Sequence, residues 1–351
     1  MSASRPVGSL EDLVAIGLPA RGHGPLARVR RVRSDYSTSA PIDEVTVELQ
    51  DGSRLDLMAK KLGATARLDA ARHAKPDFAC SATREPALYS HLVDESGPPE
   101  CWGTVDESDG PLLVLERIPG LALRHIGDLR LWQAAAVWLA GFHRRWRDLG
   151  GGNVPFGLRP HLLRYDRAHH MRLLARAKAF TTAAAAGLSP AFVEQHSRAV
   201  EILEKLPESL IHGEFYASNV IVDATTTPPR VAPIDWEMAG IGSPFLDLAA
   251  LVSGEWEPEE RQGIVDAYRS SSGLDVSQRE FECALAAAEL LISTQWMGWA
   301  SGWEPPDDLA ADWAVNAAGK AALLGRLGRD APTTGERRLI VNADDLGLTE
   351  G

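Results

Sequence analysis

The chain has 351 residues and a mass of 37.9 kDa, enough for two lobes or domains at roughly 100 to 200 residues per domain. Hydrophobic residues make up 45% and charged residues 24%, which is the composition of a globular chain and excludes a disordered one. The formal net charge of -12 argues against a nucleic-acid partner, because binding to phosphates needs an excess of Lys and Arg. A neutral or cationic small molecule is a better match.

Neither a membrane span nor a targeting segment is expected. No stretch reaches the roughly 18 uninterrupted apolar residues of a span, and Glu11 and Asp12 lie where a signal peptide would be apolar. The cysteines Cys80, Cys101 and Cys283 are odd in number and far apart, which fits neither a disulfide framework nor a zinc site. We therefore expect a protein of the reducing cytoplasm.

The first predicted element is a small antiparallel sheet over residues 27–62, where apolar residues alternate on both sides of the turn Asp51-Gly52. A helix is predicted over residues 83–93 and a buried strand over 111–118, which Pro119-Gly120 closes. Beyond this break the apolar residues follow helical spacing. They first do so in a stripe over residues 132–146, so the second half is predicted to be mainly helical.

The most informative segment is 210–237. Two apolar stretches flank the Thr- and Pro-rich turn 225–229 and predict a β-hairpin. With a register symmetric about Thr227, Asn219 and Asp235 would lie side by side at the open end of this hairpin.

These two side chains would form a hard-oxygen site suited to magnesium that bridges nucleotide phosphates. Glu214 lies five residues before Asn219 and would stand near an attacking hydroxyl. A carboxylate and an amide at this spacing, followed later by an Asp, are the arrangement of phosphoryl transfer.

The segment 210–251 resembles the catalytic core of the aminoglycoside phosphotransferase family, whose fold is similar to that of eukaryotic protein kinases. The likeness continues in the same order over about residues 25–325, which makes it more specific than one motif. It implies an α+β, two-lobed protein-kinase-like fold. The N-lobe (1–115) would hold a small antiparallel sheet, the hinge would be 116–120, and the C-lobe (121–329) would be mainly helical.

The resemblance also assigns residues to the nucleotide. Lys60, at the end of a strand, resembles the lysine that contacts the α- and β-phosphates of ATP, and Glu85 resembles its partner on a helix. Lys61 stays open as the alternative lysine. By default both lysines are ordinary solvated charges at a strand end.

Two further segments extend the likeness. Residues 113–117 resemble the hinge, and the backbone of Glu116, Arg117 and Ile118 is expected to bind the adenine. Asp247 in segment 242–249 resembles the aspartate that braces the catalytic loop, and a helix cap is its simpler explanation.

Two features depart from the family pattern. Glu214 replaces the catalytic aspartate; the intrinsic pKa values are close, about 4.3 against about 3.9, but Glu is one methylene longer. A misplacement of about 1 Å could cost roughly a hundredfold in rate. Either the loop is set back to compensate, or the enzyme is slow, or the chain binds nucleotide without transferring it. The phosphate-covering loop 34–39 has no glycine and would offer hydroxyls such as that of Ser37.

Several other residues have a structural explanation beside a functional one. Glu237 is a candidate for a metal or substrate contact and equally for a surface carboxylate. Trp296, Trp299 and Trp303 have the spacing of a core-facing helix stripe, which we prefer to a sugar platform. His169-His170, in a basic helix, is expected to be solvated.

The C-terminal residues 337–351 resemble the opening strand and metal-binding turn of carbohydrate deacetylases of the diacetylchitobiose type. In that family paired aspartates, here Asp344 and Asp345, supply a base and a metal ligand. So short a segment cannot build such a domain. We interpret residues 330–351 as a linker and a fusion cut short; an acidic tail is the simpler alternative.

Together these features predict a phosphotransferase that uses ATP and Mg2+ on a hydroxyl of a sugar or aminoglycoside-like acceptor. Glu214, Asn219 and Asp235 are the predicted catalytic residues, and Asn219 and Asp235 the predicted metal ligands. One alternative is a weak or silent nucleotide-binding protein, and a more remote one is a fragment of a bifunctional kinase and deacetylase. The choice between ATP and GTP, the acceptor and the oligomeric state stay open.

Overall fold

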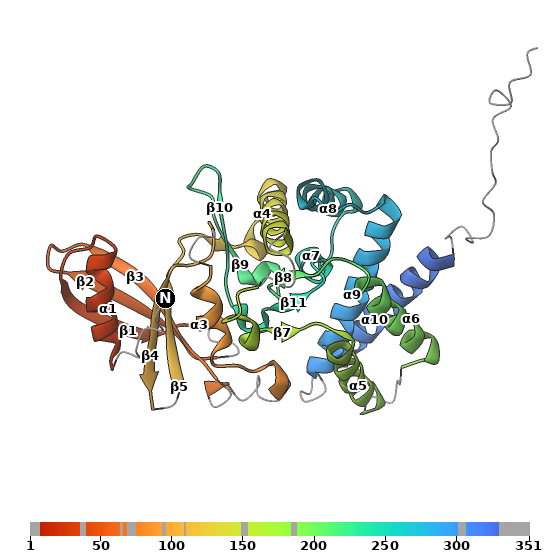
Figure 1. The fold of residues 1–351 in the computed structure, drawn as a ribbon, viewed down its shortest axis with the longest axis horizontal. Helices are drawn as coiled ribbons and strands as arrows, with labels where there is room; N and C mark the ends of the chain where they lie inside the picture. The colour runs from red at the N-terminus through yellow and green to blue at the C-terminus, as the bar shows by residue number, and fades with distance from the viewer. Residues whose placement is uncertain are drawn as a thin grey trace, which may run out of the picture.

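The structure is a computed structural model that describes residues 8–35, 40–63, 66–68, 75–92, 96–108, 110–148, 154–183, 188–300 and 307–329. Two lobes lie side by side along its long axis, a sheet in one and most of the helices in the other (Figure 1). This is the predicted α+β, two-lobed arrangement. Ser37, the predicted linker and the tail lie outside the described ranges. Within those ranges no helix has the length and apolar character needed to cross a bilayer.

Five antiparallel strands form the N-lobe sheet in the order β1-β2-β3-β5-β4. Alternate residues of β2 are buried, because successive side chains of a strand point to opposite faces. The predicted sheet and the strand before the hinge are confirmed, whereas β4 was not predicted. The strands are β1 (Leu26–Arg33), β2 (Ile42–Leu49), β3 (Arg54–Lys61), β4 (Cys101–Glu107) and β5 (Gly110–Glu116).

The helix α1 (Leu10–Ala20) covers one face of this sheet, and its apolar side lies in one buried cluster with residues of β2, β3, β4 and β5. The helix begins after Ser9, whose Oγ accepts a hydrogen bond from the Asp12 N–H at 3.1 Å. This helix was not predicted either, although the cap and the apolar spacing are present in the sequence.

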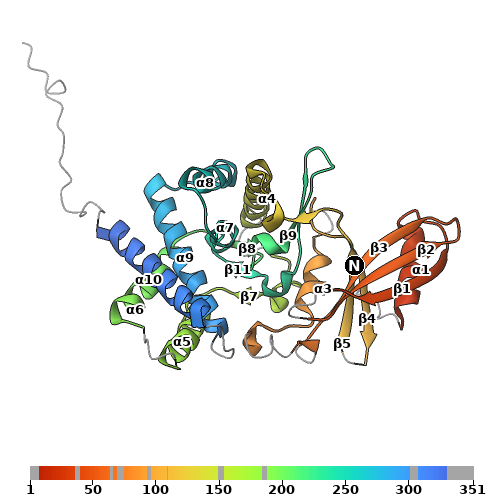
Figure 2. The same ribbon diagram turned by 180° about the vertical axis from the view of Figure 1, so that it is seen from behind.

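A segment between β3 and β4 connects the sheet to the C-lobe. The short 3-10 helix η2 (Asp77–Ala79) places Ala79 in the hydrophobic core of the C-lobe. The helix α3 (Arg84–Tyr89) follows between the two lobes in both views (Figure 2). It is shorter than the predicted helix over residues 83–93. Arg84 donates hydrogen bonds to the carbonyl oxygens of Ala79 at 2.7 Å and of His161 at 2.8 Å. Residues 77–84 are therefore attached to the C-lobe, although they precede the hinge in the chain.

Seven helices, α4 to α10, build most of the described C-lobe. The apolar stripe predicted over residues 132–146 is buried on α4, against α7 and α8. The helices are α4 (Leu129–Asp148), α5 (Arg167–Ala183), α6 (Pro190–Leu203), α7 (Phe245–Leu251), α8 (Pro258–Ser272), α9 (Gln278–Ala300) and α10 (Asp307–Arg329).

The expectation that His169 and His170 are solvated is wrong. Both are buried on α5, on the same face as Leu173, Leu174 and Ala177. This spacing is that of one helix face, and the neighbouring basic residues occupy the opposite one.

Two small three-stranded sheets connect the helices of the C-lobe and hold the loops of the site. Their strand orders are β10-β9-β6 and β7-β11-β8. The strands are β6 (Leu121–Ala122), β7 (Leu163–Arg164), β8 (Ser209–Ile211), β9 (Val220–Asp223), β10 (Arg230–Pro233) and β11 (Gly240–Gly242). Short 3-10 helices lie at η3 (Leu123–His125), η4 (Arg159–His161), η5 (Ala217–Asn219) and η6 (Trp236–Met238).

Candidate active site

The loop between β8 and β9 is held by a buried carboxylate. Asp247, in the first turn of α7, accepts hydrogen bonds from the backbone N–H groups of His212 at 2.6 Å and Gly213 at 2.8 Å. Gly213 has φ 82°, and an added Cβ would lie 2.3 Å from the Met238 carbonyl oxygen, so only glycine fits there. Asp247 thus braces the loop as predicted. The cap of α7 is Pro244, so Asp247 is not that cap.

His212 ties the same loop to the end of the β9–β10 hairpin. Its Nδ1 accepts the N–H of Glu214 at 3.3 Å, and its Nε2 lies 2.9 Å from the Ile234 carbonyl oxygen. A carbonyl can only accept, so Nε2 carries the hydrogen and the ring is neutral. Burial lowers the pKa of His212, in agreement with a neutral ring. The histidine is therefore a structural residue, as predicted.

The structure pairs Lys60 of β3 with Glu85 of α3. The Lys60 Nζ lies 2.8 Å from Glu85 Oε2 and 2.5 Å from Asp235 Oδ1. Lys61 points to the other face of the sheet, where it forms an ion pair with Glu107. The predicted pairing of Lys60 with Glu85 is confirmed, and Lys60 rather than Lys61 reaches the site.

Charges from both lobes meet at Lys60. Burial by itself would lower the pKa of Lys60, but Asp235 and Glu85 raise it well above its ordinary value. Burial raises the pKa of Glu85, against the opposing effect of Lys60. Burial would also raise the pKa of Asp235, but Lys60 and Lys75 lower it below its ordinary value. Lys60 and Asp235 therefore form a charged pair at neutral pH.

The hairpin register differs by one residue from the predicted one. Val220 pairs with Pro233 and Asp223 with Arg230, so Asn219 lies opposite Ile234 and not opposite Asp235. The six-residue turn is set by side-chain hydrogen bonds, such as that from the Arg230 N–H to Thr226 Oγ1 at 2.9 Å, and such bonds could not be located from the sequence.

Asp235 still reaches the site because the chain turns sharply after β10. It has φ 63° and ψ 61°, a left-handed conformation that is uncommon for a residue other than glycine. Such a conformation costs on the order of 1 kcal/mol and is retained where the surroundings impose it. Asn219 donates from Nδ2 to the Glu214 carbonyl oxygen at 3.0 Å, which connects the start of the hairpin to the loop.

Glu214 is buried and makes its ion pair with a lysine that was not predicted. The Lys75 Nζ lies 3.1 Å from Glu214 Oε2 and also forms a short ion pair with Glu237. Burial raises the pKa of Glu214, and Lys75 opposes this effect. Lys75 lies in an irregular segment just before η2, where neither periodicity nor a motif draws attention to it.

The predicted hinge residues lie between the two lobes. Glu116 ends β5, and its carboxylate binds Arg230 of β10 through two hydrogen bonds of 2.7 and 2.8 Å. Arg117 is exposed and lies 3.7 Å from Asp56, and Ile118 is half-buried. The side chain of Glu116 therefore joins the N-lobe sheet to the hairpin that precedes Asp235.

The tryptophan prediction holds for one residue and is wrong for another. Trp299 is buried, but Trp296 is 38% exposed. Its ring centroid lies 5.4 Å from that of Tyr216, two residues after Glu214. Trp303 lies outside the described residues. The sequence stripe could not reveal that Trp296 lies outside the core, beside the catalytic loop, while Trp299 on the same helix is buried.

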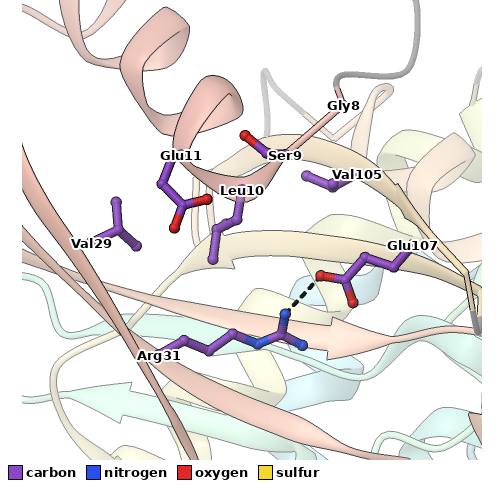
Figure 3. A pocket seen from close by; sticks show the side chains of 8 residues that line it. All are labelled: Gly8, Ser9, Leu10, Glu11, Val29, Arg31, Val105 and Glu107. Atoms are coloured by element: carbon purple, nitrogen blue, oxygen red, sulfur yellow. Dashed lines mark hydrogen bonds and ion pairs between the residues drawn. The ribbon is translucent and has the colours of Figure 1, made fainter.

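A hollow of about 240 Å³ lies in the N-lobe, beside the start of α1, and contains none of the predicted site residues. Arg31 crosses it to Glu107 in an ion pair of 2.7 Å, and Leu10, Val29 and Val105 supply apolar lining (Figure 3). The charged groups of Arg31 and Glu107 are thus engaged with each other.

Comparisons with known proteins identify the family and the fold. The sequence matches the phosphotransferase enzyme family (APH) over residues 50–281. A search of curated proteins found no match.

Three solved structures illustrate the likeness in fold. A microcompartment-associated aminopropanol kinase is 20% identical with a TM-score of 0.54, over 90% of this chain and 98% of that one. Choline kinase LicA from Streptococcus pneumoniae is 15% identical with a TM-score of 0.56, over 85% and 94%. The GDP complex of aminoglycoside 2'-phosphotransferase-IIIa is 12% identical with a TM-score of 0.56, over 89% and 97%. The chain therefore has a kinase-like fold and belongs to the phosphotransferase enzyme family.

Proposed function

We propose that the protein transfers the γ-phosphoryl group of ATP to a hydroxyl of a sugar or aminoglycoside-like small molecule. The observation that carries this proposal is the meeting of Lys60 and Glu85 from the N-lobe with Asp235 from the C-lobe. Positive and negative side chains that meet at a lobe boundary suit a phosphate chain and its metal ion. Membership of the family and the GDP complex of a structural neighbour support the use of a nucleotide.

Lys60 is assigned to the phosphates of the nucleotide. Its ammonium is charged, is held by Glu85 at 2.8 Å, and stands at the end of β3 beside the C-lobe. A charged donor of this kind binds phosphate oxygens through strong hydrogen bonds. The backbone of residues 116–118 is assigned to the adenine, because the chain leaves the sheet there and crosses between the lobes.

Asn219 and Asp235 would hold Mg2+, which when bound neutralises charge on the phosphates. The donor set fits this ion, since Mg2+ takes oxygen ligands and typically combines one or two carboxylates with substrate phosphates. The Nδ2 of Asn219 is used by the loop, so its Oδ1 is the atom left for a metal. The surrounding charges also fit. Four carboxylates lie around the two ammonium groups of Lys60 and Lys75, so the site is rich in oxygen atoms for a cation; the carboxylates are those of Glu85, Glu214, Asp235 and Glu237.

Glu214 would accept the hydrogen bond of the acceptor hydroxyl and orient its oxygen. Its loop is held at both ends, by Asp247 at His212 and Gly213 and by the amide of Asn219. Phosphoryl transfer depends mainly on positioning and electrostatics, so a carboxylate held in this way can act although it is one methylene longer than aspartate.

The alternative is a silent nucleotide-binding protein, and the exchange of aspartate for Glu214 is the feature that favours it. Release of ADP with a panel of sugars, amino alcohols and aminoglycosides separates the two. We expect turnover by the wild type and a loss of about 10²- to 10⁴-fold in Glu214→Gln, as for removal of a general base. Glu201→Gln, an exposed carboxylate on α6, is the matched control. ATP binding with no turnover in both wild type and Glu214→Asp would establish the silent protein.

A further inference from the structure

Lys75 connects the two carboxylates nearest to the reacting hydroxyl in the proposed function. Its Nζ lies 3.1 Å from Glu214 Oε2 and forms a shorter ion pair with Glu237. Its side chain is 14% exposed. A buried ammonium between two carboxylates is held firmly, because each lost contact would leave a charge without its partner.

The backbone that carries Lys75 is also held in place. The Lys75 carbonyl oxygen accepts a hydrogen bond from Arg67 at 3.1 Å. Four residues later Ala79 is buried in the C-lobe core, and Arg84 binds the Ala79 and Glu237 carbonyl oxygens. The ammonium is thus fixed relative to the C-lobe, on which Glu214 lies, and cannot swing freely with the N-lobe sheet.

Glu214 needs such a partner more than an aspartate would. Its additional methylene adds a rotatable bond, so its carboxylate can adopt more positions than that of an aspartate. The backbone of the loop is fixed by Asp247 and His212, but these contacts end at the main chain. Glu237 and Asp235 nearby would repel the carboxylate if no cation lay between them.

We propose that Lys75 is a positioning residue that fixes the longer carboxylate of Glu214 at the acceptor hydroxyl. This inference rests on the proposed function. It explains how a glutamate can serve where a shorter carboxylate is expected, through a lysine supplied by the segment before η2 and from outside the catalytic loop. Lys75 does not contact Lys60 or Glu85 in the described structure, so its effect on the nucleotide should be small.

The kinetic test compares Lys75→Met, which keeps the length of the side chain and removes the charge, in two backgrounds. With Glu214 present we expect kcat to fall by about 10- to 100-fold, since a carboxylate displaced by about 1 Å costs up to about a hundredfold. The KM for ATP and the stoichiometry of nucleotide binding should stay unchanged, and Lys75→Arg should restore part of kcat. In the Glu214→Asp background, Lys75→Met should cost less than threefold.

The matched control is Lys320→Met, which removes a lysine 2.9 Å from Glu289 between α9 and α10. It should leave kcat unchanged. Equal losses from Lys75→Met in both backgrounds would overturn the proposal, as would an unchanged or increased kcat with Glu214 present. An increase would identify Lys75 as an inhibitory contact instead.

A second measurement separates failure of this inference from failure of the proposed function. Thermal unfolding of Lys75→Met, Glu214→Gln and the double variant reports the coupling of the two side chains without any turnover. We expect the double variant to lose less in unfolding midpoint than the two single variants together. Additive losses overturn the positioning role. A wild type without phosphoryl transfer but with this coupling refutes the proposed function and leaves the contact between Lys75 and Glu214 established.

Discussion

Replacement of Asp247 by asparagine should weaken both the fold and the site. The wild-type carboxylate accepts hydrogen bonds from the backbone N–H groups of His212 and Gly213, one on each oxygen, and is fully buried. Its Oδ2 also lies 3.1 Å from His143 Nε2. Hydrogen bonds to a charged group contribute about 1.5 to 3 kcal/mol each. Asparagine keeps one acceptor oxygen and turns its amide N–H toward the other backbone donor. At least one such bond is lost and a buried donor remains unsatisfied, so we expect a loss of about 2 to 4 kcal/mol.

Differential scanning fluorimetry measures this effect. A change of 1 kcal/mol shifts the unfolding midpoint by roughly 2 to 4 °C for domains of about 150 to 250 residues. Asp247→Asn should therefore lower the midpoint by at least about 4 °C and also lower kcat, because Glu214 follows the released loop. Asp266→Asn, an exposed carboxylate on α8, should change neither. A midpoint for Asp247→Asn within about 1 °C of the wild type would refute the role of this side chain as a brace.

Three further predictions concern the nucleotide, the lobe contact and the response to acid. Lys60→Met should weaken ATP binding by at least about tenfold in isothermal titration, since it removes a charged donor; an unchanged Kd contradicts the assignment. Arg230→Gln should lower the unfolding midpoint by about 2 to 4 °C, because it breaks the bidentate contact with Glu116; a midpoint equal to that of the wild type would show that the contact adds nothing. Burial lowers the pKa of His169 to about 4 in the folded protein, whereas the pKa of this histidine in the unfolded chain is near 6.5. As the pH falls, the unfolded chain therefore binds the proton before the folded protein does. Stability should fall as the pH drops from about 6.5 to 4, by up to about 3 kcal/mol for this group, and His169→Gln should show a shallower fall; identical slopes would disprove the effect.

The elements predicted well are those whose signal is local. Alternation over β2 and β3 and the stripe on α4 were sufficient, because one face of each is buried. The pairing of Lys60 with Glu85 was inferred across 25 residues of chain, since the order of several motifs places the two residues. Asp247 was placed in the same way.

The elements predicted poorly depend on contacts that only tertiary structure supplies. The hairpin register was wrong by one residue, because the side chains of the turn and not its midpoint set the pairing. Asp235 reaches Lys60 only through a left-handed turn. Lys75 could not be found, since an isolated lysine in an irregular segment has no pattern to distinguish it from a solvated charge. The burial of His169 depends on the packing of α5 against the rest of the C-lobe.

The attachment of residues 77–84 to the C-lobe means that the chain cannot be divided cleanly at its hinge. A fragment that begins at residue 121 would lack Ala79, and the carbonyl oxygens of His161 and Glu237 would lose the guanidinium of Arg84. Each of the separated pieces would expose apolar surface that is buried in the intact chain. The helix α3 that follows also packs on the sheet, through Leu88 and Tyr89 against Leu113 and Leu115 of β5, so a cut on either side of it would expose apolar side chains.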